Sequence, residues 1–196
     1  MLDRRKTVAR ITLEAALHPT LRALPPGIVL DVGAKDAPYR PLVPATEYLT
    51  LDIRATSGAD IVGDIHDIPR QDSSVDVVIC TEVLEHCRDP KTAVSEMWRL
   101  LRPGGVCVLS TRFIHPLHPD PHDYFRFTAE GLSELFSAFT DTQITPLGTR
   151  LASAWMLLPS RPRVLARLLS LLNPAIASLP ARRSSAPCGF LVRAVR

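Results

Sequence analysis

Short apolar runs recur through the first 110 residues and constrain the fold more than any other feature of the sequence. They are rich in β-branched and aliphatic side chains, which favours buried β-strands. We expect these strands at residues 28–30, 48–51, 60–62, 75–80 and 106–110. Apolar residues recur at helical spacing over residues 90–101, before a stop at Arg102-Pro103-Gly104-Gly105. Near-continuous hydrophobic strands joined by helices or loops predict an α/β fold: a Rossmann-like, doubly wound, mostly parallel sheet with helices on both faces.

The flanking segments complete a single domain of 196 residues. An amphipathic helix near the N-terminus is expected to end at the proline-rich break over residues 17–27. Thr128 is the expected cap of a further helix. We predict a strand near residues 143–145, helices between 151 and 172, and a closing strand over 189–195. The expected divisions are a helical segment (1–26), a ligand-binding core (27–146), a basic helical insertion (147–188) and the closing strand (189–196).

Charge and cysteine usage narrow the cellular setting. The four cysteines form no CxxC pair, which favours buried thiols in a reducing compartment and argues against a structural zinc site. No uncharged apolar run is long enough for a transmembrane helix, so a cytoplasmic location is expected. Residues 147–196 hold eight arginines and no acidic residue. This tail predicts either a solvated basic face or contact with an anionic partner.

Polar residues follow the predicted strands at the edge where ligands bind in doubly wound sheets. Asp31 and Gly33 follow the first strand, and Asp52 follows the second about 20 residues later, a spacing typical of a carboxylate that binds ribose hydroxyls. Asp64 follows the third strand, where a carboxylate can accept from an adenine amino group. Each acid alone fits a cap or a solvated loop equally well. As an ordered set they predict a site for an adenosine-containing ligand.

Several segments of the sequence resemble class I S-adenosylmethionine-dependent methyltransferases. They are VLDVGAKDAPYRPL, LTLDI and the stretch from DIVGD to LSTRF, with VDVVICTEVLEHCRDP and LLRPGG the most specific; HPLHPDPHDYFRFTAEGL and APCGFLVRAV resemble a bacterial methyltransferase-domain group, of the type 11 kind. The resemblance implies a seven-stranded sheet whose last strand is antiparallel, with S-adenosylmethionine as cofactor and S-adenosylhomocysteine as product. It also implies that Asp31, Gly33 and Ala34 border the methionine part, Asp52 the ribose, Asp64 and Ile65 the adenine, and Thr81 the reactive end; we add Lys35 and Ile53 to this cofactor-side set.

One departure from the family pattern lies in the first loop. The family loop usually reads G-x-G-x-G, and here Lys35 and Ala37 replace the second and third glycines. Both carry a Cβ where the backbone passes close to a ligand. Lys35 can point outward, can reach the cofactor carboxylate as a cation, or can mark a degenerate enzyme. A pseudo-methyltransferase that acts as a binding partner therefore stays open as an alternative, whereas a nicotinamide enzyme is disfavoured because only Gly33 of G-x-G-x-x-G is kept.

The loops after the fourth and fifth strands are expected to face the transferred methyl group. Transfer from a sulfonium is an in-line displacement, and a base is needed only if the acceptor must lose a proton. His86, His122 and Tyr124 are the candidate catalytic residues. His115, His118 and His122 have helical spacing, but the prolines between them forbid a regular helix, so no metal site is expected. Tyr124 and Arg126 either hold an anionic group of the acceptor or pack the loop.

The predicted acceptor is a small molecule or a lipid-linked molecule. A basic amphipathic helix over residues 163–172 fits either a lid over the acceptor pocket or contact with an anionic membrane through residues 161–183. The second interpretation implies a membrane-peripheral protein. An RNA acceptor is disfavoured because basic residues are not interleaved with aromatic residues. The oligomeric state is not readable from the sequence.

Overall fold

A computed structural model describes residues 6–119, 122–158, 169–180 and 184–196. Its strands form one seven-stranded sheet in the order β3-β2-β1-β4-β5-β7-β6. The strands are β1 (Gly27–Val32), β2 (Ala45–Asp52), β3 (Ile61–Val62), β4 (Val75–Thr81), β5 (Leu101–Arg112), β6 (Asp141–Leu147) and β7 (Gly189–Val195). β7 is antiparallel to both β5 and β6, whereas the first five strands pair in parallel. The predicted fold class is therefore confirmed.

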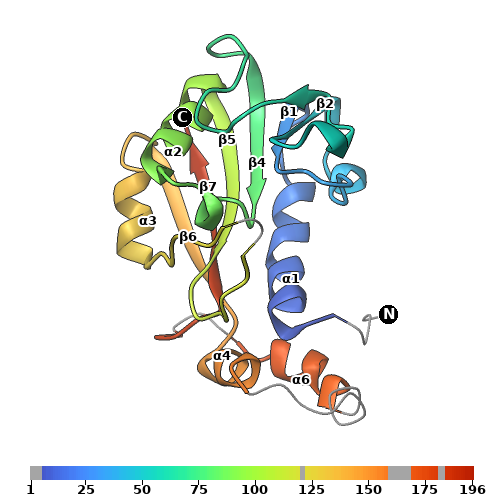
Figure 1. Ribbon diagram of the computed structural model, residues 1–196, viewed down its shortest axis with the longest axis vertical. Coiled ribbons are helices and arrows are strands. Elements are labelled where there is room, and N and C mark those ends of the chain that lie inside the picture. The colour runs from blue at the N-terminus through green and yellow to red at the C-terminus, as the bar shows by residue number, and fades with distance from the viewer. Residues whose placement is uncertain (1–5, 120–121, 159–168, 181–183) are drawn as a thin grey trace.

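Helices cover the two faces of the sheet unequally. α1 (Val8–Arg22) packs on one face, and α2 (Pro90–Leu100) and α3 (Ala129–Leu135) lie on the other, as Figure 1 shows. Successive strand residues alternate between the two cores: Val29 packs with α1, and Leu30 packs with α2 and α3. This alternation follows from the period of two in a β-strand, and it explains why the central strands are apolar on both faces.

The first helix extends further than the sequence predicted. The proline-rich segment was expected to break it at residue 17, but α1 continues through Pro19 to Arg22. Leu17 and Leu21, on either side of this proline, are both 0% exposed. Their burial offsets the missing backbone donor of Pro19, so the apolar face of the helix decides the boundary.

The stop predicted after α2 also differs. Leu101 caps α2, but Arg102-Pro103-Gly104-Gly105 lies within β5 rather than before it. The pairing of β4 with β5 shifts register between Val75 and Val77, and Gly104 has a φ of 80°. The glycine-containing turn is therefore accommodated as an irregularity at the start of the strand. Thr128 caps α3 as predicted, because its side chain accepts a hydrogen bond from Gly131 N.

Two short helices of the tail lie together beyond one end of the sheet. They are α4 (Arg150–Met156) and α6 (Asn173–Ala177), and α6 packs against the start of α1 (Figure 1). Asn173 joins them, since its side chain accepts from Trp155 Nε1 and donates to the Lys6 carbonyl. Much of the basic amphipathic helix predicted over residues 163–172 lies outside the described residues. No helix in the described ranges is long and apolar enough to cross a membrane.

Candidate functional site

The carboxyl ends of the central strands meet at one edge of the sheet. β1 lies between β2 and β4, and the chain changes direction across the sheet at the β1–β4 pair. In open α/β sheets this switch point is where ligands bind. Asp31 is level with Thr50 of β2 and Ile79 of β4. Asp52 and Thr81, at the ends of β2 and β4, lie at the same edge. The strand order therefore brings together residues far apart in the sequence.

The loop after β1 keeps a glycine-type backbone although two of its glycines are replaced. Gly33 has a φ of 68°, and a Cβ there would lie 2.4 Å from Val83 Cγ2. Lys35 and Ala37 also have left-handed φ values, of 50° and 47°. Such angles cost a residue with a Cβ about 1–2 kcal/mol. The backbone of this loop therefore has a conformation that lets a ligand approach closely. Lys35 and Ala37 adopt φ values that glycine adopts more easily.

Asp31 is almost fully buried beneath this loop. Its carboxylate accepts a hydrogen bond of 2.6 Å from the Tyr48 hydroxyl of β2, and the residue is 1% exposed. Burial raises the pKa of the carboxyl to about 6, although the Tyr48 hydrogen bond acts in the opposite direction. Asp31, the residue predicted to border the methionine part of a cofactor, therefore already accepts a hydrogen bond from β2.

Asp52 and Asp64 lie close together because β2 pairs with β3. Asp52 is level with Val62, and its carbonyl accepts from Gly63 N. The Asp52 carboxylate accepts from Arg54 N and Arg54 Nε through Oδ1. Asp64 accepts from the backbone and the ring of His66, which lower the pKa of its carboxyl. Both acids are therefore placed at the same edge, as the adenosine interpretation requires.

The other residues predicted on the cofactor side have mixed environments. Ile65 is buried in the core with Ile68, whereas Ile53 is 66% exposed. Ala34 is buried and Thr81 is half-buried. The acids thus lie at the edge of the sheet, and Ile65, next to Asp64 in the sequence, is anchored in the core.

Two acidic residues in the loop after β4 have different environments. Glu82 has a φ of 58°, accepts from Ser110 Oγ and pairs with Arg112. Glu85 is 0% exposed, and its Oε2 accepts a 2.8 Å hydrogen bond from Thr111 Oγ1. Burial, and then the negative charge of Glu82, raise the pKa of Glu85. Glu85 was not among the predicted site residues.

The loop after β5 is fixed on the backbone of Glu85. Its carbonyl accepts from Tyr124 N and Phe125 N. Asp123 pairs with Arg126, and this pairing holds the pKa of Asp123 well below its usual range. The Arg126 guanidinium also donates to the Pro116 and Phe125 carbonyls. Arg126 therefore holds the loop in shape, which favours the packing interpretation.

The three predicted catalytic residues lie on these two loops. His86 Nδ1 contacts the His122 carbonyl, which joins the loop after β4 to the loop after β5. The His122 ring lies 5.3 Å from the Tyr124 ring, measured between centroids. The Tyr124 hydroxyl accepts a 2.9 Å hydrogen bond from Arg88 Nε. The structure brings all three together, but His122 and Tyr124 are exposed.

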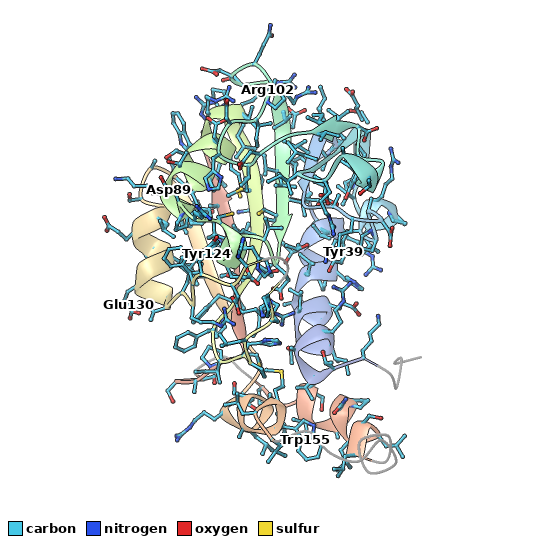
Figure 2. The ribbon with its side chains drawn as sticks, in the orientation of Figure 1. Tyr39, Asp89, Arg102, Tyr124, Glu130 and Trp155 are labelled. Carbon is cyan, nitrogen blue, oxygen red and sulfur yellow. The ribbon has the colours of Figure 1, made fainter. Side chains whose placement is uncertain are left out.

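A cavity of about 310 Å³ lies between the loop after β5 and the two tail helices. Apolar side chains form much of its wall, together with His115 and Asn173; the lining residues are Thr7, Val8, His115, Pro116, Trp155, Met156, Leu169, Ser170 and Asn173. Trp155 of α4 lies beyond the end of the sheet (Figure 2). Burial lowers the pKa of His115 to about 4, which leaves its imidazole neutral near pH 7. From the sequence, His115 could be recognised only as a loop residue. Its place in the cavity depends on the tail helices, which are remote from it in the chain.

Comparison with known proteins agrees with this geometry. Residues 43–109 match a family model described as a methyltransferase domain. A malonyl-[acyl-carrier protein] O-methyltransferase of Methylococcus capsulatus is 35% identical over 104 residues, covering 44% of this chain and 38% of that protein. A ubiquinone biosynthesis O-methyltransferase of Psychrobacter cryohalolentis is 61% identical over 36 residues, covering 18% and 14%. The chain thus matches well under half the length of these relatives.

The structural comparison extends over nearly the whole chain. A protein of Thermotoga maritima, described as a SAM-dependent methyltransferase and possible histamine N-methyltransferase, superposes with a TM-score of 0.65 at 15% identity. The match covers 98% of this chain and 90% of that one. The strand order and the superposition define a Rossmann-like fold. Residues 43–109 thus carry the sequence likeness to methyltransferases, and the strand order of the described chain agrees with their fold.

Asp31 gives a pH-dependent test of the site. A folded-state pKa of about 6 means that the folded protein holds this proton more tightly than the unfolded chain does, in which the carboxyl has its ordinary pKa of about 4. The free energy of unfolding therefore falls as pH rises between about 4 and 6, by about 3 kcal/mol, and then levels off. Asp31→Asn removes this loss, because the amide stays neutral and its oxygen can still accept from Tyr48.

Urea denaturation between pH 4 and 8 measures the effect. The stability of Asp31→Asn relative to the wild type should increase up to pH 6 and then remain constant. Tyr48→Phe serves as the control, because loss of the hydroxyl donor should extend the falling range to higher pH. A constant difference between Asp31→Asn and wild type across the whole range would contradict the raised pKa.

Proposed function

We propose that the chain binds S-adenosylmethionine at the carboxyl edge of β1, β2 and β4 and transfers its methyl group to a small, partly apolar acceptor. The bound cofactor would supply an activated methyl group on a sulfonium. Asp52 would bind the ribose hydroxyls and Asp64 the adenine amino group. The observation that carries the proposal is the convergence of these acids at the switch point of the sheet, beside a loop whose backbone keeps the glycine-type conformation.

The cofactor fits these residues on structural grounds. Gly33 leaves no room for a Cβ on the side of Val83, so its loop runs close to the β4 loop. Lys35 is exposed and Ala37 adds a single methyl group, so neither departure from the glycine pattern buries a large side chain. An experiment can distinguish an active enzyme from a pseudo-methyltransferase, because the latter would bind cofactor or acceptor without consuming either.

The acceptor would occupy the cavity beside the loop after β5. Its volume suits a small molecule or the end of a lipid-linked one, and its largely apolar wall would exclude water from the transfer. The neutral imidazole of His115 lies in this wall and can accept a proton from an acceptor hydroxyl or ammonium group. His86, His122 and Tyr124 would then position the loop that carries His115. The two relatives named as O-methyltransferases support an oxygen acceptor.

We also propose peripheral contact of the tail with an anionic membrane. Exposed leucines gather on the segments around α4 and α6, namely Leu157, Leu158, Leu171, Leu172 and Leu179. The tail from residue 147 onward adds eight arginines without an acid. Apolar side chains beside cations are the features by which a helix lies on an anionic surface. This contact would place the cavity next to a lipid-linked acceptor.

Asp52→Ala tests the cofactor site. Loss of hydrogen bonds between a carboxylate and ribose should weaken S-adenosylhomocysteine binding about tenfold or more, since such charged bonds are worth about 1.5–3 kcal/mol each. Isothermal titration calorimetry measures the affinity. Asp141→Asn is the matched control, because Asp141 begins β6, at the opposite edge of the sheet. Absence of any binding heat for the wild-type protein would refute the proposed function, whereas binding without transfer to any acceptor would favour the degenerate alternative.

Met156→Trp tests the acceptor cavity. The larger side chain should fill part of the cavity and raise KM for the acceptor about tenfold, with little change in cofactor affinity. Leu157→Trp is the control, because Leu157 is 54% exposed and does not line the cavity. The assay follows transfer of a labelled methyl group to small-molecule and lipid-extract fractions. Equal effects of the two substitutions on KM would place the acceptor elsewhere.

Sedimentation with vesicles tests membrane contact. The protein should bind vesicles containing anionic phosphatidylglycerol at low salt and dissociate as salt rises, because screening shortens the range of charge attraction. Vesicles of phosphatidylcholine alone provide the control. Leu171→Ser combined with Leu172→Ser should reduce the bound fraction severalfold. Binding that is insensitive to lipid charge and to both substitutions would rule out this contact.

A further inference from the structure

Glu85, His86 and His118 come together where the loops after β4 and β5 meet. One ligand atom from each residue lies within 4.8 Å of the others. The distance from Glu85 Oε1 to His118 Nε2 is 3.8 Å. Ligand atoms on one tetrahedral zinc ion lie about 3.3 Å apart, because each metal bond is close to 2 Å. A small movement of the side chains would therefore bring the three atoms to coordination distance.

The key carboxylate oxygen has no hydrogen-bond partner in the described structure. Glu85 is 0% exposed, and its Oε1 is buried and unsatisfied. Its other oxygen already accepts from Thr111 Oγ1. An unsatisfied buried carboxylate oxygen is costly, and it requires an explanation such as an ion. This oxygen lies 3.8 Å from His118 Nε2, so the unsatisfied atom faces one of the two imidazoles.

The surroundings of the three side chains match those of metal ligands. A ligating histidine usually donates its second ring nitrogen to a carbonyl or a carboxylate, and a ligating carboxylate is itself hydrogen-bonded. His86 Nδ1 contacts the His122 carbonyl, which can only accept, so Nδ1 is the donor and Nε2 is left for a ligand. His118 Nδ1 makes no hydrogen bond, but it lies 3.5 Å from Asp123 Oδ2, where a small rotation of the ring would let it donate, and Nε2 lies toward Glu85.

The local charges also favour a cation at Glu85. The other two carboxylates of these loops each have an arginine partner: Glu82 pairs with Arg112, and Asp123 pairs with Arg126. Glu85 has only the His118 imidazole at ion-pair distance within the described ranges. Each arginine thus pairs directly with another carboxylate and acts on Glu85 only from a longer distance, whereas His118 lies at ion-pair distance from Glu85.

We propose that Glu85, His86 and His118 bind a divalent transition-metal ion. Two imidazoles and one carboxylate are typical of zinc and related ions, whereas Mg²⁺ prefers an all-oxygen set. Three protein ligands leave a coordination position for water or another small molecule. The ring of His115 lies 4.8 Å from that of His118, so the group adjoins a residue of the cavity wall. The proposal concerns binding alone and does not rest on methyl transfer.

Titration of the chelator-treated full chain with Zn²⁺ and Co²⁺ tests the proposal. One equivalent should bind with a micromolar or tighter Kd, and Co²⁺ should give visible d–d bands typical of nitrogen and oxygen ligands. Mg²⁺ should not compete at equal concentration. Glu85→Gln and His118→Asn should each weaken Zn²⁺ binding about 100-fold, and Asp123→Asn about 10–100-fold, as loss of an outer-shell partner does.

Neighbouring histidines provide the controls. His115→Asn removes an imidazole beside His118, and His122→Asn keeps the carbonyl that contacts His86, so both variants should bind Zn²⁺ as the wild type does. Thermal melting in chelator establishes that each variant is folded. Thiolate-to-cobalt charge-transfer bands would assign the ion to the buried cysteines and overturn the proposal. The same conclusion follows if the wild type binds no Zn²⁺, or if His118→Asn binds it unchanged.

Discussion

The pairing of β1 with β4 is the constraint on which the rest of the structure depends. These two strands cross the centre of the sheet, and their side chains alternate between the core under α1 and the core under α2 and α3. Val29 and Val77 face one core, and Leu30 and Val78 face the other. A shift of one residue would exchange the two sets, so the register is strongly determined. The same register fixes the heights at which the loops carrying Gly33 and Glu82 leave the sheet.

The sequence was most informative where local pattern and burial agree. The apolar runs predicted the central strands, and Thr128 predicted the start of α3, because a cap and an alternating or helical pattern are local signals. Pro19 misled the prediction, since the burial of Leu17 and Leu21 depends on a sheet that the helix sequence does not contain. The sequence was thus sufficient to predict the fold class, but it predicted helix boundaries less accurately.

In the candidate site too, features set by strand order were predictable, and features set by loop packing were not. The acids at the ends of β1, β2 and β3 could be found because strand order places them at one edge. The grouping of Glu85 with His118 could not, because it depends on how two irregular loops pack. The prolines around His118 correctly excluded a regular helix there. They did not exclude a metal-ligating group, because ligands can come from loops, and hydrogen bonds to the Glu85 carbonyl hold these two loops together.

Backbone strain is concentrated on the same edge as these loops. Of the four described non-glycine residues with left-handed φ values, Lys35, Ala37 and Glu82 follow β1 or β4, and Ser73 precedes β4. Each costs about 1–2 kcal/mol, an expense that packing elsewhere must offset. Glycine at these positions would relieve the strain but would also enlarge the conformational freedom of the unfolded loop. Side chains that hold a strained loop in one shape lower the entropy lost when a ligand binds, so a rigid edge with few glycines favours a preformed site.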